Sequence, residues 1–309
     1  MISMIVAVLS SAICSSASVI YASIGECIGQ RSGVMNLGLE GVMLVGAVSG
    51  YITATNTNSL ALAVLAAFLA GCAAGLLFAF LTVTLRVNQS VCGIAMVMFG
   101  TGLSGMLGKN INQIATFDYF TKLAIPGLSR IPLIGPVLFD QDLMIYALYL
   151  LIPAATWFIF RTRSGLQLRA LGENPAALDA MGVNVFLQRY LYVTVGSGIV
   201  ALGGAYITLA YTPSWFDGIT AGRGWIATAI VVFAAWNPSR AALGALLFGA
   251  IEAVSLRMQS SGIPVPSYFL SMLPYIATVV VLILSTGSFL KKHTSAPAAI
   301  GVPYDREQR

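Results

Sequence analysis

Several acidic side chains interrupt the long apolar runs of this chain. Glu40 lies within one run, and Asn36 precedes it by one turn, which would place both residues on one helix face. A carboxylate and an amide on one face could bind the hydroxyls of a ribose or the edge of a base through hydrogen bonds. They could equally cap a broken helix or tie two helices together, and the sequence leaves these alternatives open.

Two further acidic residues need partners, because an acidic side chain at the centre of a membrane helix costs about 2.5–3.5 kcal/mol. Glu252 is predicted in mid-span. It either faces a water-filled pathway or pairs with Arg257 by a non-helical route, since a five-residue spacing is unfavourable within one helix. Glu26 is expected to pair with Arg31 or with a neighbouring loop.

An aromatic, glycine-rich stretch, YTPSWFDGITAGRGWIA, occupies residues 211–227. Trp215 and Trp225 belong either to the aromatic belt at a membrane interface or to a gate whose flat rings stack on a nucleobase. In the second alternative, the turn between Gly222 and Gly224 opens a short helix whose N-terminus faces the pathway.

The residue types present argue against several kinds of site. His293 is the only histidine, so neither a histidine-based metal site nor a Ser-His-Asp triad is expected. The sequence GKN at 108–110 is not a P-loop, because Leu103 and Asn110 stand where that pattern requires glycine and a hydroxyl residue. The cysteines form no CxxC pair and are expected to be small buried residues: Cys14, Cys27, Cys72 and Cys92.

Composition places the elements that carry these residues in lipid. Of 309 residues, 58% are hydrophobic and 9% are charged, whereas an average soluble domain has about 25% charged residues. A bilayer core takes about 20 apolar residues per helix, which predicts an all-α polytopic membrane bundle of about nine spans, within a range of about eight to ten. The spans are expected near 4–25, 34–54, 60–84, 91–108, 142–160, 190–211, 224–236, 241–258 and 268–287.

Two local features refine this prediction. The seventh span is short and fits a re-entrant or broken element. Glycine pairs with GxxxG spacing, Gly46/Gly50 and Gly71/Gly75, are expected to be helix contacts.

Positive charges predict the orientation. If segment 161–189 is cytoplasmic, most of the 16 lysine and arginine residues share its side: Arg31, Arg86, Arg161, Arg163, Arg169, Arg189, Arg240, Lys291, Lys292, Arg306 and Arg309. The N-terminus is then outside and the C-terminus cytoplasmic, and the net charge of +5 reflects topology rather than nucleic-acid binding. The prediction is one transmembrane domain at 1–290, with an outer loop at 109–141, and a cytoplasmic tail at 291–309.

The cytoplasmic segment contains a short helix with clear end signals. Asn174 is suited to the N-cap, Pro175 to the first helical position and Gly182 to a left-handed end, which predicts a helix at 175–181. Two turns are too short to be stable alone. Because its surface is mostly apolar, this helix is expected to dock in a groove of another protein. The alternative is a helix folded back on the chain's own spans.

Three stretches resemble one family, the ABC-importer permeases of the branched-chain amino acid, ribose and nucleoside group. LRALGENPAALDAMGVN is similar to the family's cytoplasmic coupling segment. IGECIGQRSGVMNLGLEGVMLVGA resembles the signature of its nucleoside and simple-sugar permeases, with two extra residues between Glu26 and Arg31 and with Leu37 in place of the common isoleucine. AGRGWIATAIVVFAAWNPSRAALGALLFG resembles a third segment, with Phe-Ala-Ala at 233–235 replacing Leu-Leu-Gly. The resemblance covers about residues 15–290.

This resemblance implies the shorter permease subunit of an importer in the bacterial cytoplasmic (inner) membrane. A separate ATPase subunit would bind the coupling helix and hold ATP and Mg²⁺, while this chain would bind no cofactor. A second permease, in a heterodimer, and an extracellular or periplasmic substrate-binding protein would complete the system. The solute would be a nucleoside or a related ribose-bearing or simple-sugar compound, and flavin-like cargo stays open.

The residues expected to act fall into two groups. The ATPase-coupling group is Arg169, Gly172, Glu173, Asn174, Pro175, Ala177, Leu178 and Gly182. The substrate-pathway group is Asn36, Glu40, Trp215, Trp225 and Glu252. The alternative function is an ion-coupled secondary transporter or channel that works without an ATPase. Such proteins often contain an inverted repeat, and the sequence shows no convincing internal repeat.

Overall fold

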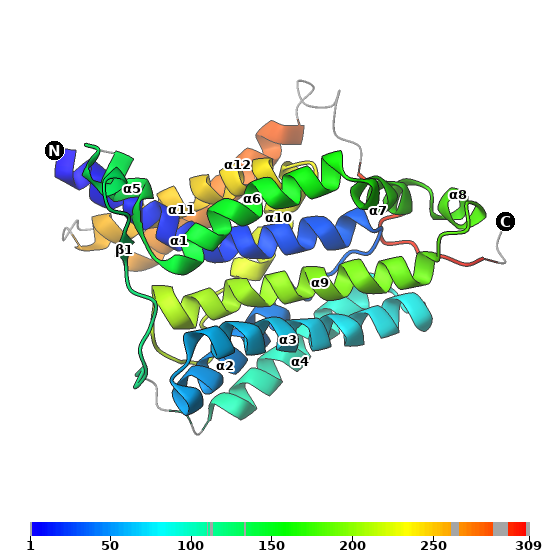
Figure 1. Ribbon diagram of the computed structural model, residues 1–309, viewed down its shortest axis with the longest axis horizontal. Coiled ribbons are helices and arrows are strands. Elements are labelled where there is room, and N and C mark those ends of the chain that lie inside the picture. The colour runs from blue at the N-terminus through cyan, green and yellow to red at the C-terminus, as the bar shows by residue number, and fades with distance from the viewer. Residues whose placement is uncertain are drawn as a thin grey trace.

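The computed structural model describes residues 2–109, 111, 114–132, 134–260, 266–286 and 296–306. This part of the chain is predominantly helical, and most of the long helices run along the long axis of the molecule (Figure 1). Two short strands, β1 (Leu123–Ala124) and β2 (Asp140–Gln141), pair antiparallel in the loop between two long helices. The prediction of a polytopic helical bundle is therefore confirmed.

The helices follow the predicted segments closely. The first four are α1 (Ile2–Arg31), α2 (Leu39–Thr57), α3 (Leu60–Ala79) and α4 (Gln89–Gly108). The next four are α5 (Ile134–Leu138), α6 (Leu143–Arg161), α7 (Arg163–Glu173) and α8 (Pro175–Ala180). The last four are α9 (Val185–Tyr206), α10 (Arg223–Phe233), α11 (Pro238–Ser260) and α12 (Ser267–Thr286). Two π-helical segments, η1 (Phe80–Thr84) and η3 (Ile207–Tyr211), extend α3 and α9, and a 3-10 turn, η2 (Leu128–Arg130), precedes α5.

Among the described residues, six helices are long and apolar enough to cross a membrane. They occupy Ile5–Arg31, Leu60–Thr84, Gln89–Gly108, Leu143–Arg161, Val185–Tyr211 and Pro238–Ser260. By contrast, α10 has 11 residues, and at about 1.5 Å per residue it covers only about half of a bilayer core. The seventh predicted segment is therefore short, as the sequence indicated.

The helix α2 begins inside the bundle. Its start lies beside the middle of α4, where Gly38 and Gly41 contact Met96. The predicted span from residue 34 therefore begins too early, and Asn36 is not on α2. The chain turns first because Gly33 adopts φ +84° and the Asn36 side chain accepts a hydrogen bond from the N–H of Gly38.

The helix α10 also starts in the interior. Residues 212–222 before it are not α-helical, and they follow η3, where the N–H of Phe120 donates to the carbonyl of Leu209 (2.9 Å). Just beyond the other end of α10, Arg31 at the end of α1 donates to the carbonyl of Trp236 (3.1 Å). Residues 212–236 therefore extend between opposite ends of the bundle, first as irregular chain and then as helix.

The core is built around α9, which packs against α1, α2 and α3 (Figure 1). Small residues permit these close contacts: Gly46 faces Ala201, while Gly71 and Gly75 face Ala201 and Ser197. A Cβ atom at any of these three glycines would overlap its neighbour. The prediction that the GxxxG pairs are helix contacts is confirmed.

The last described residues, 296–306, lie against the α7–α8 end of the bundle (Figure 1). We call them the C-terminal strap. The N–H of Ala299 donates to the carbonyl of Gly172 in α7 (2.8 Å). Lys291, Lys292 and Arg309, which entered the charge argument, lie outside the described residues, as does His293.

Candidate functional site

The predicted coupling segment forms two helices, α7 and α8, at one end of the bundle. Asn174 caps α8, since its Oδ1 accepts a hydrogen bond from the N–H of Ala177 (3.0 Å). Pro175 is the first residue of α8, and Gly182 follows the helix with φ +83°. These end signals are confirmed, although the helix stops at Ala180, one residue earlier than predicted.

The two faces of α8 differ in exposure. Leu178 is 1% exposed and packs within the chain, whereas Met181, just after the helix, is 71% exposed. Ala176 and Ala177 are also exposed. The helix is thus anchored to its own chain through Leu178, and small apolar side chains remain on its free face.

The predicted residues of α7 likewise include some that pack on the bundle and one that is exposed. The Arg169 guanidinium lies 5.7 Å from the centre of the Phe160 ring, and that of Arg31 lies 5.4 Å from the same ring. Gly172 packs against the backbone of Arg31. Glu173, by contrast, is exposed. Arg169 and Gly172 therefore hold α7 on the bundle, while Glu173 belongs to its outer surface.

The C-terminal strap binds α8 through Asp179. Arg306 donates to this carboxylate from Nε (2.7 Å) and Nη2 (2.5 Å), and the Tyr304 hydroxyl donates to it (3.0 Å). A second ion pair joins Asp305 to Arg86 (2.6 Å). The hydrogen bonds from Arg306 lower the pKa of Asp179 below its ordinary value of 3.8. The strap thus links α8 to the turn before α4.

Glu40 joins the N-termini of two helices. Its Oε1 accepts hydrogen bonds from the Thr220 hydroxyl (2.5 Å) and the N–H of Gly222 (2.8 Å), and its Oε2 accepts one from the N–H of Gly224 (2.7 Å). Glu40 also lies in the first turn of α2. Because both helices direct the positive ends of their dipoles here, one buried carboxylate stabilises both. These are the contacts of a helix cap.

Asn36 and Glu26 form a separate cluster. The N–H of Asn36 donates to Glu26 Oε1 (3.1 Å), and so does Gln30 Nε2 (2.7 Å). Glu26 therefore has a loop partner, one of the two expected. Asn36 and Glu40 do not share a helix face, because the helix starts only at Leu39.

Glu252 pairs with Arg223 across α10 and α11, with 2.7 Å between Oε1 and Nη2. The Arg223 guanidinium also lies 5.0 Å from the centre of the Tyr211 ring. The other carboxylate oxygen of Glu252 is buried without a hydrogen-bond partner among the described residues. Both charged residues line a cavity of about 230 Å³ between α10, α11 and α12, here named the Glu252 cavity. Spacing along one helix could not identify this pair.

The two tryptophans have different surroundings. Trp215 is 2% exposed and packs beside Tyr51 and Gly108, with 6.5 Å between the Trp215 and Tyr51 ring centres. Trp225 is 45% exposed on α10. The structure therefore does not bring them together in one aromatic gate.

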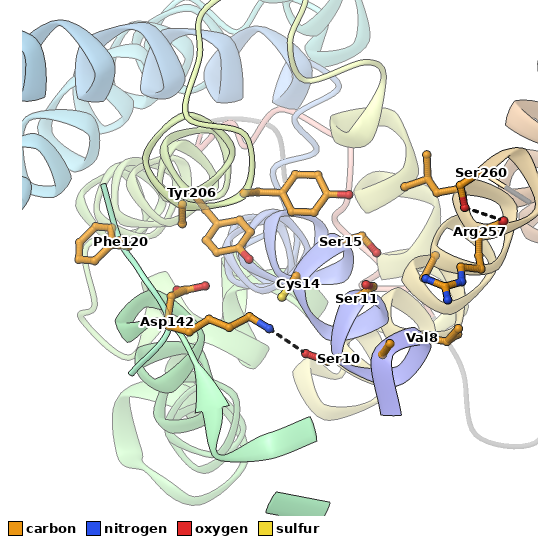
Figure 2. A pocket seen from close by; sticks show the side chains of 16 residues that line it. Val8, Ser10, Ser11, Cys14, Ser15, Phe120, Asp142, Tyr206, Arg257 and Ser260 are labelled. Atoms are coloured by element: carbon orange, nitrogen blue, oxygen red, sulfur yellow. Dashed lines mark hydrogen bonds between the residues drawn. The ribbon is translucent and has the colours of Figure 1, made fainter. Parts of the chain in front are cut away.

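A cavity of about 470 Å³ is lined by Phe120 and Lys122, which immediately precede β1. Figure 1 shows β1 at the end of the bundle opposite α7 and α8. Figure 2 shows Tyr206, Cys14 and Asp142 on one side of this cavity and Arg257 and Ser260 on the other. We call it the serine–tyrosine cavity. Its polar and aromatic lining is Ser10, Ser11, Cys14, Ser15, Phe120, Lys122, Asp142, Tyr206, Tyr211, Arg257 and Ser260.

Sequence reasoning missed this cavity, since none of the five predicted pathway residues lines it. One signal was available: Ser10, Ser11 and Ser15 place hydroxyls close together in the first half of a long helix. The other walls come from segments far apart in the chain, which no local pattern connects.

The family model and the similar proteins all describe permeases of transport systems. A family model described as the permease component of the branched-chain amino acid transport system matches residues 7–284. A putative glucose ABC transporter permease protein, TsgC13 of Haloferax volcanii, is 36% identical over 93% of this chain and 94% of its own.

Two further relatives are 34% identical. The nucleoside ABC transporter permease protein NupC of Lactococcus lactis matches over 94% of this chain and 93% of its own. The guanosine ABC transporter permease protein NupQ of Bacillus subtilis matches over 95% and 94%.

Proposed function

Because this chain belongs to the branched-chain amino acid transport permease family, we propose that it carries nucleosides or simple sugars into the cell as one subunit of an ATP-binding cassette importer. The chain is a transport subunit rather than an enzyme. The observation that carries the solute class is its similarity, over nearly the full length, to permeases named for glucose, nucleosides and guanosine.

In this proposal a separate ATPase subunit binds ATP and Mg²⁺ and docks on α8. The exposed Ala177 and Met181 offer it a small apolar surface, with Glu173 and Asn174 at the rim. Leu178 and the C-terminal strap hold α8 to the permease, so displacement of the docked helix would pull on the bundle. Alternating access would follow if the inward-open and outward-open states bind the ATPase and the binding protein with different affinities.

The membrane arrangement is also part of the proposal. Nine segments cross the bilayer, with the N-terminus outside, the C-terminus in the cytoplasm and residues 212–236 as the broken seventh pass. The host membrane is the bacterial inner membrane. A substrate-binding protein delivers the solute at the end opposite α8, and a second, different permease completes the pathway.

One observation favours an alternative, an ion-coupled secondary transporter. Discontinuous helices whose N-termini meet in the bundle interior are typical of such proteins, and α2 and α10 meet in this way at Glu40. The two functions differ in whether transport requires an ATPase partner.

Association with the ATPase tests the importer proposal. We expect the ATPase subunit of the same transport system to co-purify with the wild-type chain, and Met181→Asp to abolish this association because it places a charge on the apolar docking surface. Leu128→Asp is the matched control, since Leu128 is 43% exposed and lies in η2, at the end of the bundle opposite α8. Leu178→Asp is unsuitable, because it would bury a charge. Equal ATPase recovery with Met181→Asp and with the wild type would contradict docking at α8.

A further inference from the structure

We propose that the serine–tyrosine cavity binds one five- or six-membered sugar ring bearing adjacent hydroxyls, either as a free sugar or within a nucleoside. The inference rests on the proposed function and adds a location and a recognition chemistry to it. Its basis is the combination of volume, hydroxyl-rich floor, aromatic wall and opposed charges in one cavity.

The volume of this cavity fits one small solute. At about 470 Å³ it falls within the range of about 300–1,000 Å³ that is common for small-molecule sites. Its walls come from α1, the end of α9, η3, α11 and the loop that carries Lys122. A site assembled from five segments can change shape when the segments move, as a transport site must.

Two tyrosines stack on each other beside the cavity. The ring centres of Tyr206 and Tyr211 are 6.4 Å apart with an interplanar angle of 24°. Tyr206 is 1% exposed, so surrounding residues fix its position, while Tyr211 is only partly buried. The partly exposed ring of Tyr211, held in place by Tyr206, can therefore stack on a nucleobase or on the C–H face of a sugar ring.

The floor of the cavity supplies hydroxyls. Ser15 donates to the carbonyl of Gly249 (3.0 Å), which leaves its oxygen able to accept from a solute. Ser10 accepts from Gln141 Nε2 (3.1 Å) and from Lys122 Nζ (3.5 Å), which leaves its own O–H able to donate. Ser11 is exposed on the same helix. Neighbouring donors and acceptors match the alternating capacity of vicinal hydroxyls.

The lining carries charged groups of both signs, Asp142 on the one hand and Lys122 and Arg257 on the other. Asp142 lies across the cavity from Arg257 (Figure 2). One oxygen of Asp142 already accepts a hydrogen bond from the N–H of Ile145 (3.0 Å), and Lys122 is committed to Ser10. A carboxylate accepts hydrogen bonds and a guanidinium donates several, so a polyhydroxylated molecule can donate to Asp142 and accept from Arg257.

The cavity adjoins the broken seventh segment. Tyr211 lines it. The Arg223 guanidinium lies over the Tyr211 ring and also pairs with Glu252. Leu256 lines both this cavity and the Glu252 cavity. A solute that displaced Tyr211 or Leu256 would therefore reach the Arg223–Glu252 pair and the helix start that Glu40 caps.

Protection from alkylation tests the site in the assembled importer. The four native cysteines are replaced by alanine, and Ser11→Cys or Leu9→Cys is introduced on α1. Leu9 is 44% exposed and does not line the cavity, so it is the matched control. At a solute concentration ten times Kd, we expect guanosine or glucose to slow maleimide labelling of Ser11→Cys by about tenfold and to leave Leu9→Cys unchanged.

The outcomes separate the possible sources of the sugar ring. Protection by guanosine alone assigns a nucleoside, protection by glucose alone assigns a free sugar, and either result supports the proposal. Protection by tyrosine but by neither sugar compound would overturn the recognition chemistry. Normal ATP-driven uptake of guanosine or glucose without protection would overturn the site alone, whereas loss of that uptake in the wild type would refute the proposed function instead.

A filling variant provides a second readout. Ser11→Trp is expected to reduce uptake by at least about tenfold, because its side chain occupies the cavity and competes with the solute, while Leu9→Trp retains uptake. Both variants are checked for normal membrane insertion and ATPase association. Full uptake by a correctly assembled Ser11→Trp importer would contradict the proposal.

Discussion

Glu40 shows why a charge can be retained inside an apolar bundle. Gly222 is the N-cap residue of α10 and has no side chain with which to cap the helix, so the carboxylate arrives from α2. The arrangement satisfies backbone N–H groups that the irregular stretch 212–222 leaves unpaired. Glu40 therefore supplies the hydrogen-bond acceptors that these N–H groups lack where the helix is interrupted before α10.

Replacing this carboxylate should weaken the fold. Glu40→Gln removes the negative charge and directs an amide N–H toward groups that are themselves donors. Since hydrogen bonds to charged groups contribute about 1.5–3 kcal/mol each, we expect a loss of about 2–3 kcal/mol, seen as a lower thermal unfolding midpoint in detergent. The matched control is Asp217→Asn, which neutralises an exposed carboxylate before α10. Equal midpoints for both variants would show that Glu40 is not a structural cap.

The pair formed by Arg223 and Glu252 has a different character. It is partly buried and borders a cavity, and one carboxylate oxygen is left without a partner among the described residues. A pair of this kind tends to contribute little net stability, because the cost of desolvation offsets the attraction. The pair therefore serves the lining of the Glu252 cavity more than the stability of the bundle.

At the scale of elements, α8 and the C-terminal strap form one unit. The helix is too short to be stable by itself. Leu178 inserts into the chain, and Asp179 receives Arg306 and Tyr304 from the strap. These contacts hold α8 on two sides, as the proposed docking of an ATPase on this helix requires.

Exchanging the charges of the strap pair tests this unit. Arg306→Asp and Asp179→Arg should each release the strap through like-charge repulsion, while the double exchange should restore it. The measurement is the rate at which a protease of broad specificity removes a C-terminal tag. We expect each single variant to be cleaved several-fold faster than the wild type and the double variant to approach the wild-type rate. Equal rates in all four proteins would refute attachment at Asp179.

The same pair predicts a dependence on pH. Because the pKa of Asp179 is lowered in the folded protein, its ion pair is fully present above the ordinary value of 3.8 and is lost as the pH falls through the lower folded value. Strap protection should therefore be constant from neutral to mildly acidic pH and should disappear only in strong acid. Release of the strap near neutral pH would contradict this prediction and would require the titration of a group other than Asp179.

At the scale of the whole molecule, the features that were predictable from sequence are those with local causes. Apolar length indicated the helices, glycine spacing indicated the packing around α9, and Asn174, Pro175 and Gly182 marked the ends of α8. The start of α2 was misjudged, because apolar residues continue through the irregular stretch before Leu39. The turn there depends on Gly33 and on the side chain of Asn36.

The features that could not be predicted depend on contacts between residues distant in sequence. Glu40 meets residues 220–224, and Glu252 meets Arg223 from another helix. The serine–tyrosine cavity joins α1 with segments more than 100 residues away. A periodic pattern within one segment carries no information about such long-range contacts. Hydropathy and residue spacing therefore predicted the bundle but did not locate the cavities inside it.

Taken together, the molecule places α8 at one end and the serine–tyrosine cavity at the other, with residues 212–236 between them. The most direct test is uptake by liposomes that contain this chain, its second permease, the ATPase and the substrate-binding protein. We predict accumulation of labelled guanosine or glucose that requires ATP hydrolysis and every one of these partners. Uptake of the same solutes by this chain alone, driven by a proton or sodium gradient without ATP, would contradict the importer assignment.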